Sequence, residues 1–168
     1  MLRKSPGSIT WQDIVDLATN RISESTHLEL KRQPIADNLE VAHDTSSIAN
    51  GGGGDLILGV PEINGVAQPP TPFPNGEKEG TRVVQIVVSG VSPRLRIATQ
   101  PISAPGGDVV VVRIQRSHMP AMVHLQNRTE FWIRRDRQRV RMSHAEIIAM
   151  ATAEQEETYI EKDFLSDG

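Results

Sequence analysis

The side chains of this sequence that are best suited to catalysis are those of three glutamates, Glu24, Glu29 and Glu62. Carboxylate oxygens are the ligands that Mg²⁺ and Mn²⁺ prefer, and such ions cleave phosphodiesters by activating water and stabilising the leaving oxygen. Lys31 lies two residues after Glu29, on the same face of an extended segment, where its ammonium could steady a phosphate. The pattern predicts a Mg²⁺ or Mn²⁺ site at the three glutamates, with Lys31 completing a catalytic set.

A simpler interpretation of the same residues stays open. Glu29 and Lys31 would form an ion pair on one face of an edge strand, and Glu24 would be a solvated loop acid. The five histidines show no spacing typical of metal ligands, and the absence of cysteine excludes disulfides and thiolate metal sites. No other cofactor is predicted.

Arginines dominate the segment from Arg113 to Arg141, where eight of them face only two acids. Arginines concentrated at the end of a strand or on a hairpin form a surface that follows a phosphate backbone. The predicted nucleic-acid-binding residues are Arg134, Arg135, Arg137 and Arg139. The predicted partner is therefore nucleic acid, either DNA or RNA.

The charge changes sign near the C-terminus, because the last fifteen residues contain six acids and one lysine. Such a segment can mimic a nucleic-acid backbone and compete for the arginines, or it can dock a protein partner. The chain is expected to comprise an N-terminal segment with a leading helix (1–22), one domain (23–150), whose bounds follow from the family resemblance given below, and an acidic tail (151–168).

Periodicity and capping residues predict the elements that position these side chains. Thr10 with Asp13, and Ser143 with Glu146, are capping pairs that open the first and last helices. The valine-rich segment 81–91 has strand propensity but helical spacing, which favours a helix. The predicted helices are 11–20, 37–49, 81–91 and 144–156. The predicted strands are 27–32, 56–60, 94–102, 109–115 and 130–134. Asn64-Gly65 is a predicted hairpin turn, and an exposed proline-rich connection follows at 69–80. The fold class is α/β (α+β), with a mixed, mainly antiparallel sheet and helices packed on it.

Four consecutive glycines, Gly51–Gly54, resemble a phosphate-binding loop in composition but not in position. A phosphate loop precedes a helix, so that the helix N-terminus faces the anion. These glycines follow a predicted helix and precede a predicted strand, and no Gly-Lys-Ser/Thr follows. They are better interpreted as a tight turn in which two backbone segments approach closely.

Three segments in order resemble the Schlafen-like (AlbA-like) DNA-binding domain family. They are Glu24-Ser-Thr-His-Leu-Glu29-Leu-Lys31, then Ala49-Asn50-Gly-Gly-Gly-Gly-Asp-Leu-Ile-Leu-Gly59-Val60-Pro61-Glu62, and Phe131-Trp-Ile-Arg134 before the last helix. The resemblance spans about residues 23–150. It implies an α/β nucleic-acid-binding domain, and in one branch of the family a metal-dependent ribonuclease whose acids would match Glu24, Glu29 and Glu62.

The sequence departs from the family pattern at four places. Leu30 replaces a phenylalanine, two extra glycines precede Asp55, Pro61 takes the first place of an acidic pair, and no glycine follows Arg134. Pro61 weakens the expectation of a metal site most directly. Because no apolar run approaches the ~18 residues of a membrane span, the protein is expected to be soluble and cytoplasmic, with no membrane partner; a homo-oligomer is left open.

Overall fold

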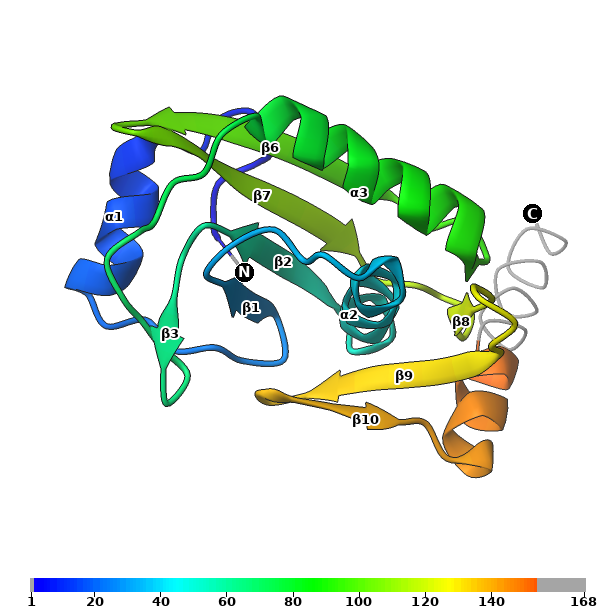
Figure 1. The fold of residues 1–168 in the computed structure, drawn as a ribbon. Helices are drawn as coiled ribbons and strands as arrows, with labels where there is room; N and C mark the ends of the chain where they lie inside the picture. Colours follow the sequence, from blue (N-terminus) through cyan, green and yellow to red (C-terminus); the bar gives the residue numbers. More distant parts are fainter. Residues whose placement is uncertain (1, 154–168) are drawn as a thin grey trace, which may run out of the picture.

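The structure, a computed structural model, describes residues 2–153, whose centre is a four-stranded mixed sheet (Figure 1). The strand order is β1-β2-β7-β6, with β1 (Leu28–Lys31) parallel to β2 (Gly53–Leu58). The other pairs, β2 with β7 (Gly107–Gln115) and β7 with β6 (Ile97–Ala104), are antiparallel. The predicted α/β class with a mainly antiparallel mixed sheet is confirmed.

Two hydrophobic clusters cover the two faces of this sheet. Helices α2 (Asn38–Asn50) and α3 (Gly76–Gly90) pack on one face, against alternate strand residues such as Leu56 and Val112. Helix α1 (Trp11–Thr19) packs with Leu28, Leu30 and Ile57 on the other face. The alternation of side chains along β1 therefore sends its leucines towards α1 and Glu29 towards the opposite side.

A second sheet has the order β10-β9-β8-β5 and lies beside α2 (Figure 1). Its strands are β5 (Val91–Ser92), β8 (Met122–Val123), β9 (Glu130–Arg135) and β10 (Gln138–Arg141). Strands β9 and β10 form a hairpin whose turn contains Asp136 in a left-handed conformation. A short hairpin of β3 (Glu62–Ile63) and β4 (Val66–Ala67) turns at Asn64-Gly65, as predicted.

Capping confirms both helix starts that the sequence predicts. Thr10 and Asp13 form a reciprocal capping box at α1. Ser143 and Glu146 exchange the corresponding hydrogen bonds, and residues 144–153 are helical as far as the described chain extends. No helix within residues 2–153 has the length and apolar character needed to cross a membrane. The rest of the predicted last helix (154–156) and residues 154–168 of the predicted acidic tail lie outside the described residues.

Several predicted details were wrong. Strand β2 begins at Gly53 rather than Leu56 and ends at Leu58, and strands β5 and β8 were not expected. Helix α3 begins at Gly76, inside the segment expected to be an open connection, because the Asp108 carboxylate accepts from the Gly76 amide at 2.8 Å and acids occupy the first turn. Strand β6 begins at Ile97 rather than Arg94. Strand β10 was not expected, since its sequence Gln-Arg-Val-Arg offers one apolar side chain.

The glycine run does form the close turn that its position predicts. Helix α2 ends at Asn50, and Gly52 and Gly53 have positive φ angles. A Cβ on Gly54 would collide with the backbone of His27, so the approach of β1 to β2 requires glycine at this position.

Candidate nucleic-acid interface

All four predicted catalytic residues line one open cleft of about 620 Å³, called here the carboxylate cleft. Glu29 and Lys31 come from β1, Glu24 precedes that strand, and Glu62 begins β3. The remaining lining residues are Leu30, Arg32, Pro61, Ile63, Gln68, Pro69 and Thr71. The fold thus brings together side chains that are up to 38 residues apart in sequence, as the motif order indicates.

Glu29 is buried, at 7% exposure, and two cations neutralise it. The Lys31 ammonium lies 2.8 Å from one carboxylate oxygen, and the Arg134 guanidinium pairs with the other. The ion pair of Glu29 with Lys31 that the simpler interpretation predicts is therefore present. Because both oxygens already face cations, the carboxylate has little need of a further positive charge.

Glu24 is half-buried rather than solvated, and one of its oxygens accepts from the Leu30 amide at 2.9 Å. Burial raises its pKa, and the nearby Glu62 acts in the same direction, while the Leu30 hydrogen bond and Arg134 oppose the shift. Glu62 is exposed, and its carboxylate accepts from the Gly65 amide within the β3–β4 turn. Two carboxylates of different exposure thus border the same cleft.

The three glutamates do not fit a divalent cation in this arrangement. Within residues 2–153, no three His, Asp or Glu side chains converge as metal ligands. Glu29 is already paired with Arg134 and Lys31, so a cation that bound this carboxylate would have to displace those partners.

A second hollow of about 550 Å³, the hairpin cleft, adjoins the first and shares Glu24 and Glu62 with it. The tip of the β9–β10 hairpin and the Asn64-Gly65 turn also line it. Its other lining residues are Asn64, Gly65, Arg135, Asp136, Arg137 and Gln138. The hairpin tip is fixed in place, because Arg137 donates to the Asn64 carbonyl and the Asp136 amide donates to the Thr26 hydroxyl at 2.9 Å.

The four predicted phosphate-binding arginines separate into two groups. Arg135 and Arg137 are exposed and line the hairpin cleft, although Arg135 also pairs with Glu146 of the last helix. Arg134 faces inward at 3% exposure, where it donates to the carbonyls of Ser25 at 2.7 Å and Leu28 at 3.2 Å. Alternation along the strand explains the difference, since neighbouring residues of β9 point to opposite faces.

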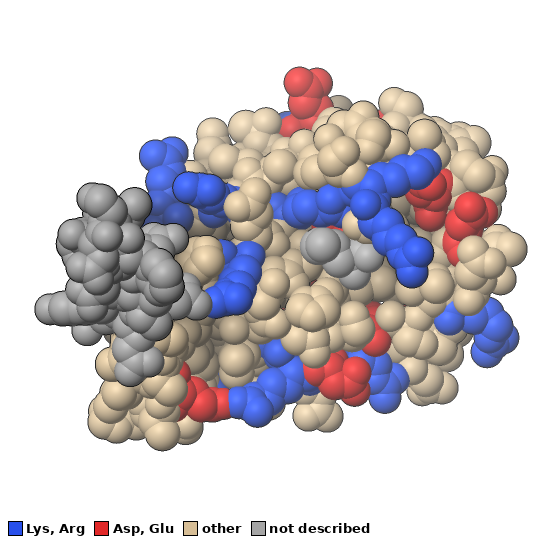
Figure 2. Space-filling model, turned by 180° about the vertical axis from the view of Figure 1, so that it is seen from behind, with Lys and Arg blue, Asp and Glu red and all other residues tan. Residues whose placement is uncertain are grey.

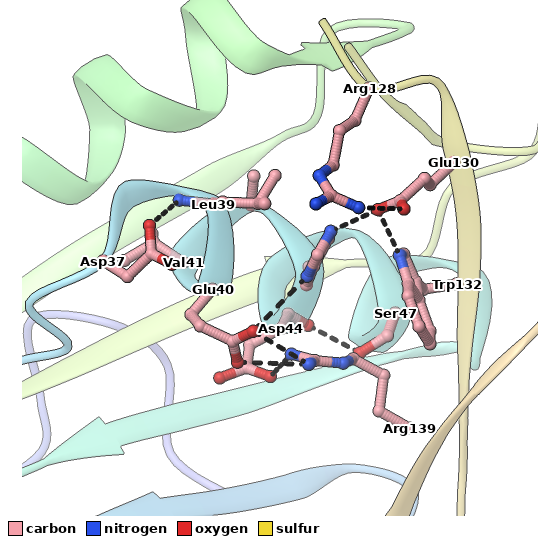
Figure 3. A network of polar contacts seen from close by, with 12 residues as sticks. Asp37, Leu39, Glu40, Val41, Asp44, Ser47, Arg128, Glu130, Trp132 and Arg139 are labelled. Carbon is pink, nitrogen blue, oxygen red and sulfur yellow. Dashed lines mark hydrogen bonds and ion pairs between the residues drawn. The ribbon is translucent and has the colours of Figure 1, made fainter. Parts of the chain in front are cut away.

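Arg139 is also occupied within the fold, by acids of α2 (Figure 3). Its guanidinium donates to Asp44 at 2.6 Å and to both oxygens of Glu40 at 3.1 and 3.2 Å. The same guanidinium lies 5.1 Å from the centre of the Trp132 ring. Arg139 therefore joins β10 to α2, and the sequence pattern could not separate this role from phosphate binding.

Glu130 is the centre of the neighbouring polar cluster, which sequence reasoning did not identify. It accepts from the Trp132 indole at 3.1 Å and contacts His43 of α2 at 2.6 Å (Figure 3). Burial by itself would raise the Glu130 pKa, but the bonds from Trp132 and His43, together with the charge of Arg141, hold that pKa at about 2. The cluster anchors β9 to α2 and so fixes the strand that carries Arg135.

Comparison with known proteins agrees with the sequence motifs. The family model described as Schlafen, AlbA_2 matches residues 24–143. No curated protein matches the chain.

Two solved structures share the fold. One is the N-terminal domain of a protein from Nitrosomonas europaea described as related to the ATP-dependent DNA helicase RecG, with 23% identity and a TM-score of 0.58 over 81% of this chain and 96% of that one. The other is the DIP2311 protein from Corynebacterium diphtheriae, with 13% identity and a TM-score of 0.54 over 76% of this chain but 24% of that one. At these identities the likeness concerns the fold alone.

Proposed function

Because the chain belongs to the Schlafen AlbA_2 family, we propose that it binds nucleic acid, with the hairpin cleft receiving part of the strand. The observation that carries this proposal is the position of Arg135 and Arg137. Both are exposed at a hairpin tip that borders a hollow, and the hairpin is tied to the rest of the fold on both sides. Guanidinium groups bind phosphate oxygens with paired hydrogen bonds. A phosphate would compete with Glu146 for Arg135, and Arg137 keeps one nitrogen on the Asn64 carbonyl.

The polar groups around the arginines suit a nucleotide better than a simple anion. Asn64 and Gln138 bring amide groups that can donate to and accept from sugar or base edges. Glu24 and Glu62 are acceptors, which match ribose hydroxyls or base amino groups but repel phosphates. The cleft therefore offers phosphate contacts from the hairpin residues and acceptors from Glu24 and Glu62.

Arg134 and Arg139 have positioning roles in this proposal. Arg134 connects β9 to the segment that precedes β1, and Arg139 connects β10 to α2. Both strands of the hairpin are thereby held while Arg135 and Arg137 remain exposed. The helicase-related name of the Nitrosomonas europaea protein supports a role with nucleic acid but does not specify DNA or RNA here.

A metal-dependent ribonuclease is the second candidate function. The observation in its favour is that Glu24, Glu29, Glu62 and Lys31 line one cleft beside the proposed strand site. The pairing of Glu29 with Arg134 argues against it, because a cation would have to replace that partner. Binding without cleavage is therefore the function that the geometry supports best.

The test uses the pure full-length chain with fluorescently labelled single-stranded RNA, tRNA and duplex DNA, each in Mn²⁺ and in EDTA. Saturable binding of at least one nucleic acid in EDTA, with the nucleic acid intact in both buffers, is the expected result. Cleavage confined to Mn²⁺ would favour the second candidate. The absence of saturable binding to any of the three at low salt would refute the proposal.

A further inference from the structure

A second basic surface lies beyond the C-terminal end of β7 and borders Asn50 and Gly52 of the second sequence motif. Two hollows of about 300 and 350 Å³ adjoin there and share Arg116, Ser117 and His118. Arg94 and Arg96, from the segment between β5 and β6, line the first hollow. We call the surface formed by Arg94, Arg96, Arg116 and His118 the Arg116 groove.

The arginines of this groove differ from those of the β9–β10 hairpin in their partners. Arg94, Arg96 and Arg116 are exposed, and none of them pairs with a carboxylate anywhere in the described chain from residue 2 to residue 153. On the hairpin, by contrast, Arg135 pairs with Glu146 and Arg139 with Asp44. An arginine without an internal partner can bind a phosphate without first giving up an ion pair. The affinity gained from counterion release is then not reduced by the loss of that pair.

The Arg116 groove is also connected to the hairpin cleft. Glu146 lines the hollow of about 350 Å³ and pairs with Arg135, which lines the hairpin cleft. Arg135 therefore stands between the two surfaces. Figure 2 shows Lys and Arg side chains in a row across the upper part of one face of the molecule, and Asp and Glu among further basic side chains along its lower part. Basic side chains spread over a surface can hold a strand by its phosphates alone.

From these observations we infer that the Arg116 groove is a second phosphate-binding surface, which receives the phosphodiester backbone of the same nucleic-acid strand that enters the hairpin cleft. This inference rests on the proposed function. The lining residues of the groove include Gln115 as a donor but no Phe, Tyr or Trp among those described, so bases have no aromatic platform there. Recognition in the groove is accordingly independent of sequence.

An acidic protein segment is the competing occupant, since carboxylates also pair with arginine. Two features favour the phosphodiester backbone. The groove arginines come from two segments, before β6 and after β7, which spreads positive charge along a path rather than at a point. The ion pair of Glu146 with Arg135 also links the groove to a cleft whose amides and carboxylates suit nucleotides.

The experiment measures the binding of labelled single-stranded RNA and duplex DNA by the full chain over a series of salt concentrations. The test variant is Arg94→Ala/Arg116→Ala. The matched control is Arg21→Asn/Lys78→Ala, which removes the same charge from exposed positions elsewhere; asparagine suits the positive φ of Arg21. All four substituted residues are exposed, and melting temperatures of both variants verify that the fold is unchanged.

The test variant should lower the slope of log K against log salt by about 0.7 to 0.9 for each lost phosphate contact, which at ~0.15 M salt corresponds to roughly 20-fold weaker binding for two contacts. The control should bind like wild type. Equal affinity of the two variants, while wild type still binds, would refute phosphate binding in the Arg116 groove. It would leave the proposal for the hairpin cleft unaffected. Poly-glutamate that binds wild type as tightly as RNA does, and loses affinity equally in the test variant, would instead assign the groove to an acidic protein partner. Failure of wild type to bind nucleic acid would remove the proposed function itself.

Discussion

Replacing Arg134 with alanine should destabilise the domain strongly, whereas the same change at the adjacent Arg135 should not. Arg134 is 3% exposed, and its guanidinium pairs with the buried Glu29 while donating to the carbonyls of Ser25 and Leu28. Its removal leaves a buried carboxylate with Lys31 as its remaining cation, and it takes one donor from each of two carbonyls, which keep their backbone partners. Arg135 has a side chain that is 60% exposed and pairs only at the surface, with Glu146.

The expected magnitudes are well separated. Breaking a buried ion pair by removing one partner costs about 3–5 kcal/mol, which for a domain of this size lowers the melting temperature by about 6 to 20 °C. Loss of an exposed ion pair costs roughly 0–1 kcal/mol. Lys31 still neutralises part of the Glu29 charge, so the lower half of the first range is expected for Arg134→Ala.

Urea titration of wild type and the two variants, followed by circular dichroism at pH 7, measures the difference. A third variant, Arg134→Met/Glu29→Leu, removes both charges and should recover much of the lost stability, because no unpaired charge remains in the interior. If Arg134→Ala unfolds at the same urea concentration as Arg135→Ala, the inward position of Arg134 is refuted, and this arginine returns to the candidate phosphate ligands.

Three further predictions concern the carboxylates and the tail. Burial raises the Glu24 pKa, so the folded state binds that proton more tightly than the unfolded state, and stability should fall as pH rises from the ordinary value of 4.5 through the raised pKa. Glu24→Gln should flatten this part of the curve of stability against pH. A curve that is unchanged in the variant would contradict the raised pKa. Mn²⁺ should leave the melting temperature equal to that in EDTA within error, because Glu29 is already neutralised; a rise that disappears in Glu29→Gln would show a metal site instead. Deleting residues 154–168, which carry six acids and one lysine, should raise the affinity for nucleic acid at low salt. The effect should be smaller near ~0.15 M salt, where screening shortens the reach of charge to about 8 Å. Equal affinity of the two chains at low salt would refute competition by the tail.

The sequence predicted the fold from local patterns and the grouping of the candidate residues from the family resemblance. Capping pairs located the starts of α1 and the last helix, and valines at helical spacing identified α3 against their strand propensity. The resemblance placed Glu24, Glu29 and Glu62 in one set, and they line one cleft. Hydrophobic alternation in β1 placed Leu28 and Leu30 on the core side.

The partner of each charged side chain could not be predicted, because pairing depends on residues that are distant in sequence. Arg139 reaches Asp44 across 95 positions, and Arg134 reaches Ser25 across 109. In a row of arginines, the one that faces inward is distinguishable only when the register of the strand is known. The Arg116 groove was missed for the same reason, since Arg94 and Arg116 are close only when β6 pairs with β7.

The most direct test of the proposed interface is the salt dependence of nucleic-acid binding by Arg135→Ala/Arg137→Ala, compared with Arg21→Asn/Lys78→Ala, which loses the same charge away from the cleft. If Arg135 and Arg137 contact phosphates, the first variant should bind every sequence more weakly to a similar degree, and its slope of log K against log salt should fall by about 0.7 to 0.9 per contact. The second variant should retain the wild-type slope. A slope for Arg135→Ala/Arg137→Ala equal to that of wild type would contradict binding at the hairpin cleft.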